Sequence, residues 1–159
     1  MSIFVKKEGE NKAVWCMLDL HIEGDICDFG AFAVHSRDLA SHLKWCHRVI
    51  LFAATIGARF ARELQKQSRL SPSRAYALQG EGTRAIERFC DALCEWFTKE
   101  KNARLRTRFS PGYGDLSLEV QREVFRLLEP AKHIGLCLNY SMVMSPSKSV
   151  TAFVGVENE

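Results

Sequence analysis

The segment Arg108-Phe109-Ser110-Pro111-Gly112-Tyr113 gathers residue types that suit a binding loop. The guanidinium of Arg108 could hold a carboxylate, and a tyrosine beside glycine can pack against an aromatic ring. Backbone groups at Ser110 and Gly112 could read the edge of a flat ligand, which glycine allows to approach closely. The same residues would also serve as a structural turn with an exposed arginine. A ligand platform and a plain turn are therefore both open.

Asp19, His21 and Gly24 match the letters of a motif through which some proteins offer a histidine to the cobalt of cobalamin. That motif opens a helix in a parallel α/β domain and requires a glycine pair further along the chain. Here a predicted strand follows, and the sequence contains no Gly-Gly pair. Because a motif outside its structural context is a weak signal, we do not expect His21 to bind cobalt.

His42 and Cys46 stand four residues apart, so on a helix they would share a face and could share a metal. Two ligands do not make a site, and a half-buried thiol beside a surface histidine is the simpler interpretation. Cys90 and Cys94 fall on a predicted apolar helix stripe, where Cys90 has a packing role. The sequence thus predicts no metal site, and no side chain is placed as a nucleophile or general base.

Apolar periodicity, capping residues and turn residues divide the chain into elements that must position these groups. The predicted elements are strands at 13–22 and 27–34, a helix at 36–45, a strand at 48–57, helices at 58–70 and 73–99, a strand at 103–110, a helix at 117–128, and strands at 134–144 and 149–156. The long helix contains Gly80 and Gly82, where it could kink. This order predicts the α+β class, with a mostly antiparallel sheet packed with helices, one of them long.

The predicted strand at 103–110 alternates strictly between basic and other side chains. Since successive side chains of a strand point to opposite faces, Arg104, Arg106 and Arg108 are expected to share one face. Such a face could anchor a ligand at one end and meet an acidic partner along the rest.

The composition, with 47% hydrophobic and 26% charged residues, predicts one globular domain over 13–159, preceded by a poorly ordered segment at 1–12. A formal charge of +3 does not favour nucleic acid as a partner. No apolar run is long enough for a membrane span, and the N-terminus lacks the features of a signal peptide. A cytoplasmic location with reduced cysteines is therefore expected.

The opening segment fits the Arg-x-x-x-Gly-Tyr signature of the activation domain of cobalamin-dependent methionine synthase, and the chain resembles small stand-alone relatives of that domain. The resemblance continues through Gly114-Asp115-Leu116, Ile134-Gly135 and the segment 144–151. Upstream it includes residues 51–57 and 83–87. Together these matches span residues 36–156 in the order of the family.

The resemblance implies binding of S-adenosylmethionine (AdoMet) and docking to a corrinoid protein. In the family, inert cob(II)alamin is reduced by one electron, usually from a flavodoxin-like donor, and is remethylated by AdoMet. Carried over by position, Arg108 would hold the methionine carboxylate, and Glu87 would face the amino or sulfonium end. The backbone at Ser110 and at the Gly112-Tyr113 turn would contact the adenosine. Cobalamin itself would belong to the partner, because no corrinoid motif is expected in this chain.

Two functional hypotheses remain open. In the first, the chain is a stand-alone activation module of a methionine synthase or a related corrinoid methyltransferase in methionine biosynthesis, and is not a complete enzyme alone. In the second, it is a non-catalytic docking subunit that binds a corrinoid protein without AdoMet. The second hypothesis draws on a departure from the family, since Leu138-Asn139-Tyr140-Ser141 stands where relatives often carry Leu-Thr-Glu-Ser.

Overall fold

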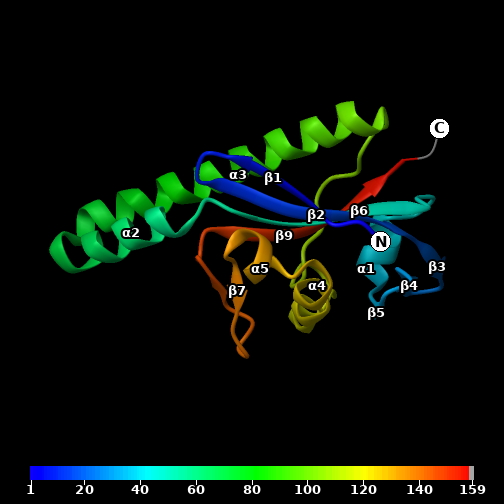
Figure 1. Cartoon of the computed structure of the whole chain (residues 1–159). Helices are drawn as coiled ribbons and strands as arrows, with labels where there is room; N and C mark the ends of the chain where they lie inside the picture. The colour runs from blue at the N-terminus through cyan, green and yellow to red at the C-terminus, as the bar shows by residue number, and fades with distance from the viewer. Residues whose placement is uncertain (158–159) are drawn as a thin grey trace.

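The computed structural model describes residues 1–157, and its centre is a four-stranded antiparallel sheet (Figure 1). The strands lie in the order β1 (Phe4–Glu8), β2 (Asn11–Asp19), β6 (Arg48–Thr55) and β9 (Ser149–Val156). Helices cover both faces of this sheet. The predicted α+β class, with a mostly antiparallel sheet and one long helix, is therefore confirmed.

Strand β6 is buried on both faces, as its continuous apolar sequence predicts. Leu51 and Ala53 belong to the core on one side of the sheet, whereas Phe52 and Ala54 belong to the core on the other side. This division follows from the two-residue repeat of a strand. The sheet thus separates two hydrophobic cores.

One core is covered by a hairpin of two helices, α2 (Ala58–Leu70) and α3 (Pro72–Lys101). Figure 1 shows that α2 and the first part of α3 extend beyond the sheet. Helix α3 is continuous through Gly80 and Gly82, and its buried stripe follows helical spacing, as predicted. Among residues 1–157, no helix has both the length and the apolar character that a membrane crossing requires.

The other core is covered by shorter elements. They are α1 (Arg37–His42), the 3-10 turn η1 (Leu118–Val120), α4 (Gln121–Leu128), α5 (Pro130–Ile134), a small sheet of β3 (His21–Glu23), β4 (Ile26–Asp28) and β5 (Ala33–His35), and a pair formed by β7 (Cys137–Leu138) and β8 (Met144–Ser145). The hydroxyl of Ser36 accepts a hydrogen bond from the N–H of Leu39, so Ser36 is the N-cap of α1.

Several segments differ from the sequence-based expectations. The predicted strand at 13–22 is divided between β2 and β3, and the predicted strand at 27–34 is divided between β4 and β5. Residues 1–12, for which little order was expected, contain β1, and Phe4 of this strand stacks on Trp15 of β2. The segment 134–144 is not one strand: it contains the end of α5, the short strand β7, a turn at 139–143 and the first residue of β8. The segment 103–110 contacts β9 through isolated bridges only. Residues 158–159, the end of the predicted domain, lie outside the described part of the chain.

Candidate functional site

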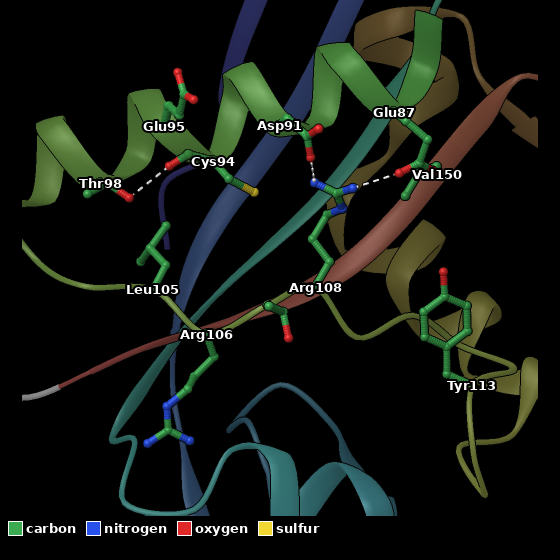
Figure 2. Close-up of a pocket in the computed structure, with 11 residues that line it drawn as sticks. Glu87, Asp91, Cys94, Glu95, Thr98, Leu105, Arg106, Arg108, Tyr113 and Val150 are labelled. Atoms are coloured by element: carbon green, nitrogen blue, oxygen red, sulfur yellow. Dashed lines mark hydrogen bonds and ion pairs between the residues drawn. The ribbon is translucent and has the colours of Figure 1, made fainter. Parts of the chain in front are cut away.

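An open groove lies between the C-terminal half of α3 and the segment 105–113 (Figure 2). Its volume is about 600 Å³, within the range of roughly 300 to 1,000 Å³ that is usual for small-molecule sites. Three carboxylates, those of Glu87, Asp91 and Glu95, line it from α3, and Arg108 and Tyr113 line it from the facing segment. Arg106 also belongs to the lining, so the groove combines an acidic wall with two arginines.

Arg108 is held by two carboxylates from successive turns of α3. Its Nη1 donates to Oδ1 of Asp91 at 2.9 Å, and its Nη2 donates to Oε2 of Glu87 at 2.8 Å. The Arg108 side chain is 21% exposed, whereas Asp91 is 67% exposed. Burial opposes the charge, but the hydrogen bond to Asp91 and the nearby cysteines outweigh it and raise the pKa of Arg108 above its usual value. The guanidinium thus stays charged and fixed against the groove wall.

The Arg108 side chain points toward α3 because the segment 105–109 has one residue more than the part of β9 that lies opposite it. Leu105 lies opposite Val156, and Phe109 lies opposite Phe153. Between these two pairs the segment advances by four residues, whereas β9 advances by three. One surplus residue on one side of an antiparallel pair is the mark of a β-bulge, which exchanges the faces that the following side chains occupy.

The prediction that three arginines share one face is consequently wrong. Figure 2 shows Arg108 directed toward α3 and Arg106 directed the opposite way, toward α1. Arg106 donates to the carbonyls of His42 at 2.8 Å and Lys44 at 2.9 Å, and it forms an ion pair with Glu157 at 2.8 Å. Arg106 therefore stabilises the fold and is not a free surface charge. Arg104, with a side chain that is 90% exposed, is the arginine of this segment that faces solvent.

The loop after Arg108 is a compact turn closed by its own backbone. The N–H of Tyr113 donates to the carbonyl of Ser110 at 3.0 Å, and the N–H of Gly112 donates to the carbonyl of Leu116 at 2.8 Å. Gly112 has a φ of +94°, a conformation that is unfavourable for residues other than glycine. The tight turn leaves Tyr113 55% exposed at the groove, where its ring packs against that of Phe109 in a T-shaped arrangement.

Asp115 ties this loop to the start of α1. Its carboxylate accepts hydrogen bonds from the hydroxyl of Ser36 and from the backbone N–H groups of Arg37 and Asp38. The hydroxyl of Ser36 and these backbone donors hold the pKa of Asp115 below its usual value, against a smaller opposing effect of burial. The helix terminus thereby fixes the loop that presents Tyr113.

Three of the five residues implied by the resemblance, Glu87, Arg108 and Tyr113, line the groove together. Ser110 and Gly112 form the turn beneath Tyr113 and, within the described residues, do not line the groove. Sequence reasoning missed Asp91, although it follows Glu87 by four residues and shares its helix face. That spacing was the available signal, since the contact with Arg108 joins distant parts of the chain.

The other candidate residues from the sequence, His21, His42 and Cys90, make contacts within the fold. His21 pairs with Asp28 across two short strands. The Nε2 atom of His42 lies 2.7 Å from the carbonyl of Thr107. Burial raises the pKa of the Cys90 thiol to about 12, in keeping with a packing role. Within residues 1–157, no group of three or more histidine, cysteine, aspartate or glutamate side chains is arranged to hold a metal ion.

The antiparallel sheet, the 30-residue helix α3 and the groove beside it define an activation-domain-like fold of the methionine synthase type. The chain is similar to a crystal structure of the MetH reactivation domain bound to AdoHcy, with a TM-score of 0.73 and 17% sequence identity. The similarity covers 91% of this chain and 58% of that one, so the chain spans little more than half of its length. No family model and no curated protein matches the sequence. At this identity the comparison shows the fold.

Proposed function

We propose that this protein binds AdoMet in the groove beside α3 and serves as an activation module for a partner corrinoid protein. The observation that carries the proposal is the placement of Arg108, a fixed cation on the wall of a groove of suitable size, in a fold shared with a domain that was crystallised with AdoHcy. The resemblance of the 108–113 segment to the family signature supports the same ligand.

Arg108 keeps the capacity to hold a carboxylate. A guanidinium has five N–H donors, and the hydrogen bonds to Asp91 and Glu87 use two of them. The remaining donors suit the methionine carboxylate of AdoMet, which a guanidinium can bind through two parallel hydrogen bonds. Arg108 would therefore anchor the amino-acid end of the ligand while α3 holds the guanidinium in place.

The acidic wall suits the positive end of the same ligand. Arg108 engages Oε2 of Glu87, so Oε1 remains available for the amino group or the sulfonium. Glu95 adds a further carboxylate to the groove. Tyr113 offers an exposed ring edge for the adenosine, with the Ser110 and Gly112 backbone beneath it. A ligand with one carboxylate and two positive groups matches this distribution of charge.

The proposed role in methyl transfer is one of positioning. AdoMet would supply the methyl group, and the partner's corrinoid, after one-electron reduction by a flavodoxin-like donor, would supply the nucleophilic cobalt. The bond between the sulfonium and the methyl group would break, and S-adenosylhomocysteine would leave. No proton has to move, so the groove requires no general base. The chain would hold the sulfonium in line with the partner's corrinoid. It would then be one component of a methyltransferase and not a complete enzyme.

Calorimetry with AdoMet tests this function. Wild type is expected to bind saturably, and Arg108→Ala is expected to bind about ten- to a hundredfold more weakly, the loss that corresponds to one strong charged hydrogen bond. Arg104→Ala is the matched control, because Arg104 belongs to the same segment and is 90% exposed. Equal affinity for wild type and Arg108→Ala would refute the carboxylate assignment.

The second candidate function is docking without AdoMet. It is favoured by the two carboxylates that already engage Arg108 and by Asn139, which stands where relatives often carry an acid. Folded protein that shows no saturable AdoMet binding up to millimolar concentration, but still binds a corrinoid protein encoded beside it, would establish this alternative. A neighbouring corrinoid gene would be consistent with both functions.

A further inference from the structure

A second groove, with a volume of about 500 Å³, lies on α3 beside the segment that leads into β9. Lys148 reaches it from this segment, while Thr83 and Arg84 line it from α3, one turn before Glu87. Tyr76 lines it from the start of α3. This groove is separate from the AdoMet groove, and the function proposed above makes no use of it.

Lys148 is fixed in the groove by a hydroxyl and not by a carboxylate. Its Nζ donates to Oγ1 of Thr83 at 3.0 Å, and the Thr83 hydroxyl donates in turn to the carbonyl of Gln79 at 3.0 Å. Lys148 is half-buried. Within residues 1–157, neither Lys148 nor Arg84 forms an ion pair, although Glu81 also lines the groove. Two cations therefore share one groove with the carboxylate of Glu81, and neither is held in an ion pair within the described residues.

Two glycines make room for these cations. A side chain at Gly80 would lie 3.3 Å from Nη1 of Arg84, so the guanidinium lies over the helix at a position that glycine leaves open. A side chain at Gly82 would lie 2.5 Å from the ring of Phe60 and 3.1 Å from Cγ of Lys148, so this glycine makes room for both neighbours. A glycine inside a helix costs about 1 kcal/mol relative to alanine, so two of them within one turn require a reason. The placement of Arg84 and Lys148 supplies part of that reason.

The surrounding charge favours an anion as well. Residues 58–84 carry six basic and two acidic side chains, so the net positive charge of this segment is larger than the formal charge of +3 of the whole chain. A concave site in a region of net positive charge attracts anionic ligands. The groove is also larger than an isolated oxyanion requires, so it can accommodate a larger molecule that carries such a group.

We propose that this groove is a binding subsite for a phosphoryl group, held by the ammonium of Lys148 and the guanidinium of Arg84. Thr83 orients the ammonium through its hydroxyl, which is already engaged with the helix backbone. The remaining N–H donors of Lys148 and those of Arg84 suit the several acceptor oxygens of a phosphate. The proposal goes beyond the AdoMet function, because AdoMet carries no phosphate.

Backbone amide NMR of the full chain tests the proposal with inorganic phosphate, adenosine 5′-monophosphate and adenosine as probes. Phosphate is expected to shift the amides of Gly80, Thr83 and Lys148 saturably, with an affinity about tenfold lower in Lys148→Gln, the ratio that one charged hydrogen bond supplies. Tighter binding of the nucleotide than of phosphate would identify a phosphomonoester as the ligand. Equal binding of the two would identify free phosphate.

The control variants separate a built site from general attraction to a basic surface. Arg84→Gln alters an exposed side chain, so it tests the subsite if Lys148→Gln folds poorly. Lys66→Gln removes an exposed charge of α2 outside the groove and should leave phosphate binding unchanged. The proposal would be overturned by shifts that do not saturate, or by shifts that Lys66→Gln weakens as much as Arg84→Gln does. Binding of adenosine without binding of phosphate would also overturn it. AdoMet binding does not enter these outcomes.

Discussion

Asp38 and Asp115 bind each other's backbone. The N–H of Asp38 donates to Oδ1 of Asp115 at 3.1 Å, and the N–H of Asp115 donates to Oδ2 of Asp38 at 3.0 Å. Gly114 lies directly against Asp38, and a side chain there would collide with its carboxylate. This reciprocal pair joins the loop that carries Tyr113 to the start of α1, so the shape of the loop and the stability of α1 depend on each other.

Ser36→Ala is expected to lower the free energy of unfolding by about 1 to 2 kcal/mol, the upper part of the range for an N-cap. Ser36 is buried, caps the N–H of Leu39 and donates to Asp115, so the change removes both contacts. Urea unfolding measures the difference. Ser41→Ala is the control, because Ser41 is an exposed residue of the same helix. Equal effects of the two changes would contradict the structural role of Ser36.

Asp115 predicts a dependence of stability on pH. The Ser36 hydroxyl, followed by backbone N–H donors, holds the pKa of Asp115 below its usual value. The charged carboxylate therefore stabilises the folded state above the unfolded pKa of about 4, and this contribution is lost as the pH falls through the lower pKa of the folded state. Asp115→Asn does not titrate, so wild type should lose more stability on acidification. Parallel losses in urea unfolding of the two proteins would refute this assignment.

Gly82→Ala is expected to destabilise the protein by about 1 to 2 kcal/mol. The added methyl group would lie 2.5 Å from the ring of Phe60, and crowding of this kind outweighs the gain of about 1 kcal/mol in helix propensity. Gly80→Ala is the control, because its methyl group meets the movable end of Arg84, and it should stabilise the protein. In a Phe60→Ala background, Gly82→Ala should lose its unfavourable effect. Thermal unfolding of wild type and the four variants provides the test.

The cysteines are expected to react with a maleimide at neutral pH in a fixed order. Cys137 is exposed and should react first. Burial raises the pKa of Cys94 although Arg108 opposes this, so Cys94 should react slowly. Burial raises the pKa of Cys16 and Cys90 to about 12, and these thiols should react only after unfolding. Mass spectrometry of digested protein reports the order, with Cys137→Ser as the control. Labelling of Cys90 in folded protein would contradict its buried position in the core.

Elements with strong local signals were predictable from the sequence. The apolar run of β6, the amphipathic α2 and the capped start of α1 lie where the residues indicated. Strand β1 was missed because its pattern is weak and its order depends on pairing with β2, where Phe4 meets Trp15. The segment 134–144 was overextended, since an apolar stretch cannot by itself distinguish a strand from a loop that packs on a core.

The candidate site was predictable in part. The family signature led to Arg108 and Tyr113, and both line the groove together with Glu87. The pairing of Arg108 with Asp91 could not be read from the sequence, because it depends on how α3 lies over the segment 103–109. The roles of these residues toward AdoMet remain the proposal that calorimetry tests.

The surplus residue between Leu105 and Phe109 has a consequence for how such domains can diverge. Because it reverses the side to which Arg108 points, the position of this charge depends on the length of the segment as well as on its amino-acid types. A relative that is one residue shorter here could keep the same arginine and still present it to α1 instead of α3. Gaps in an alignment of this segment would then carry as much functional information as substitutions do.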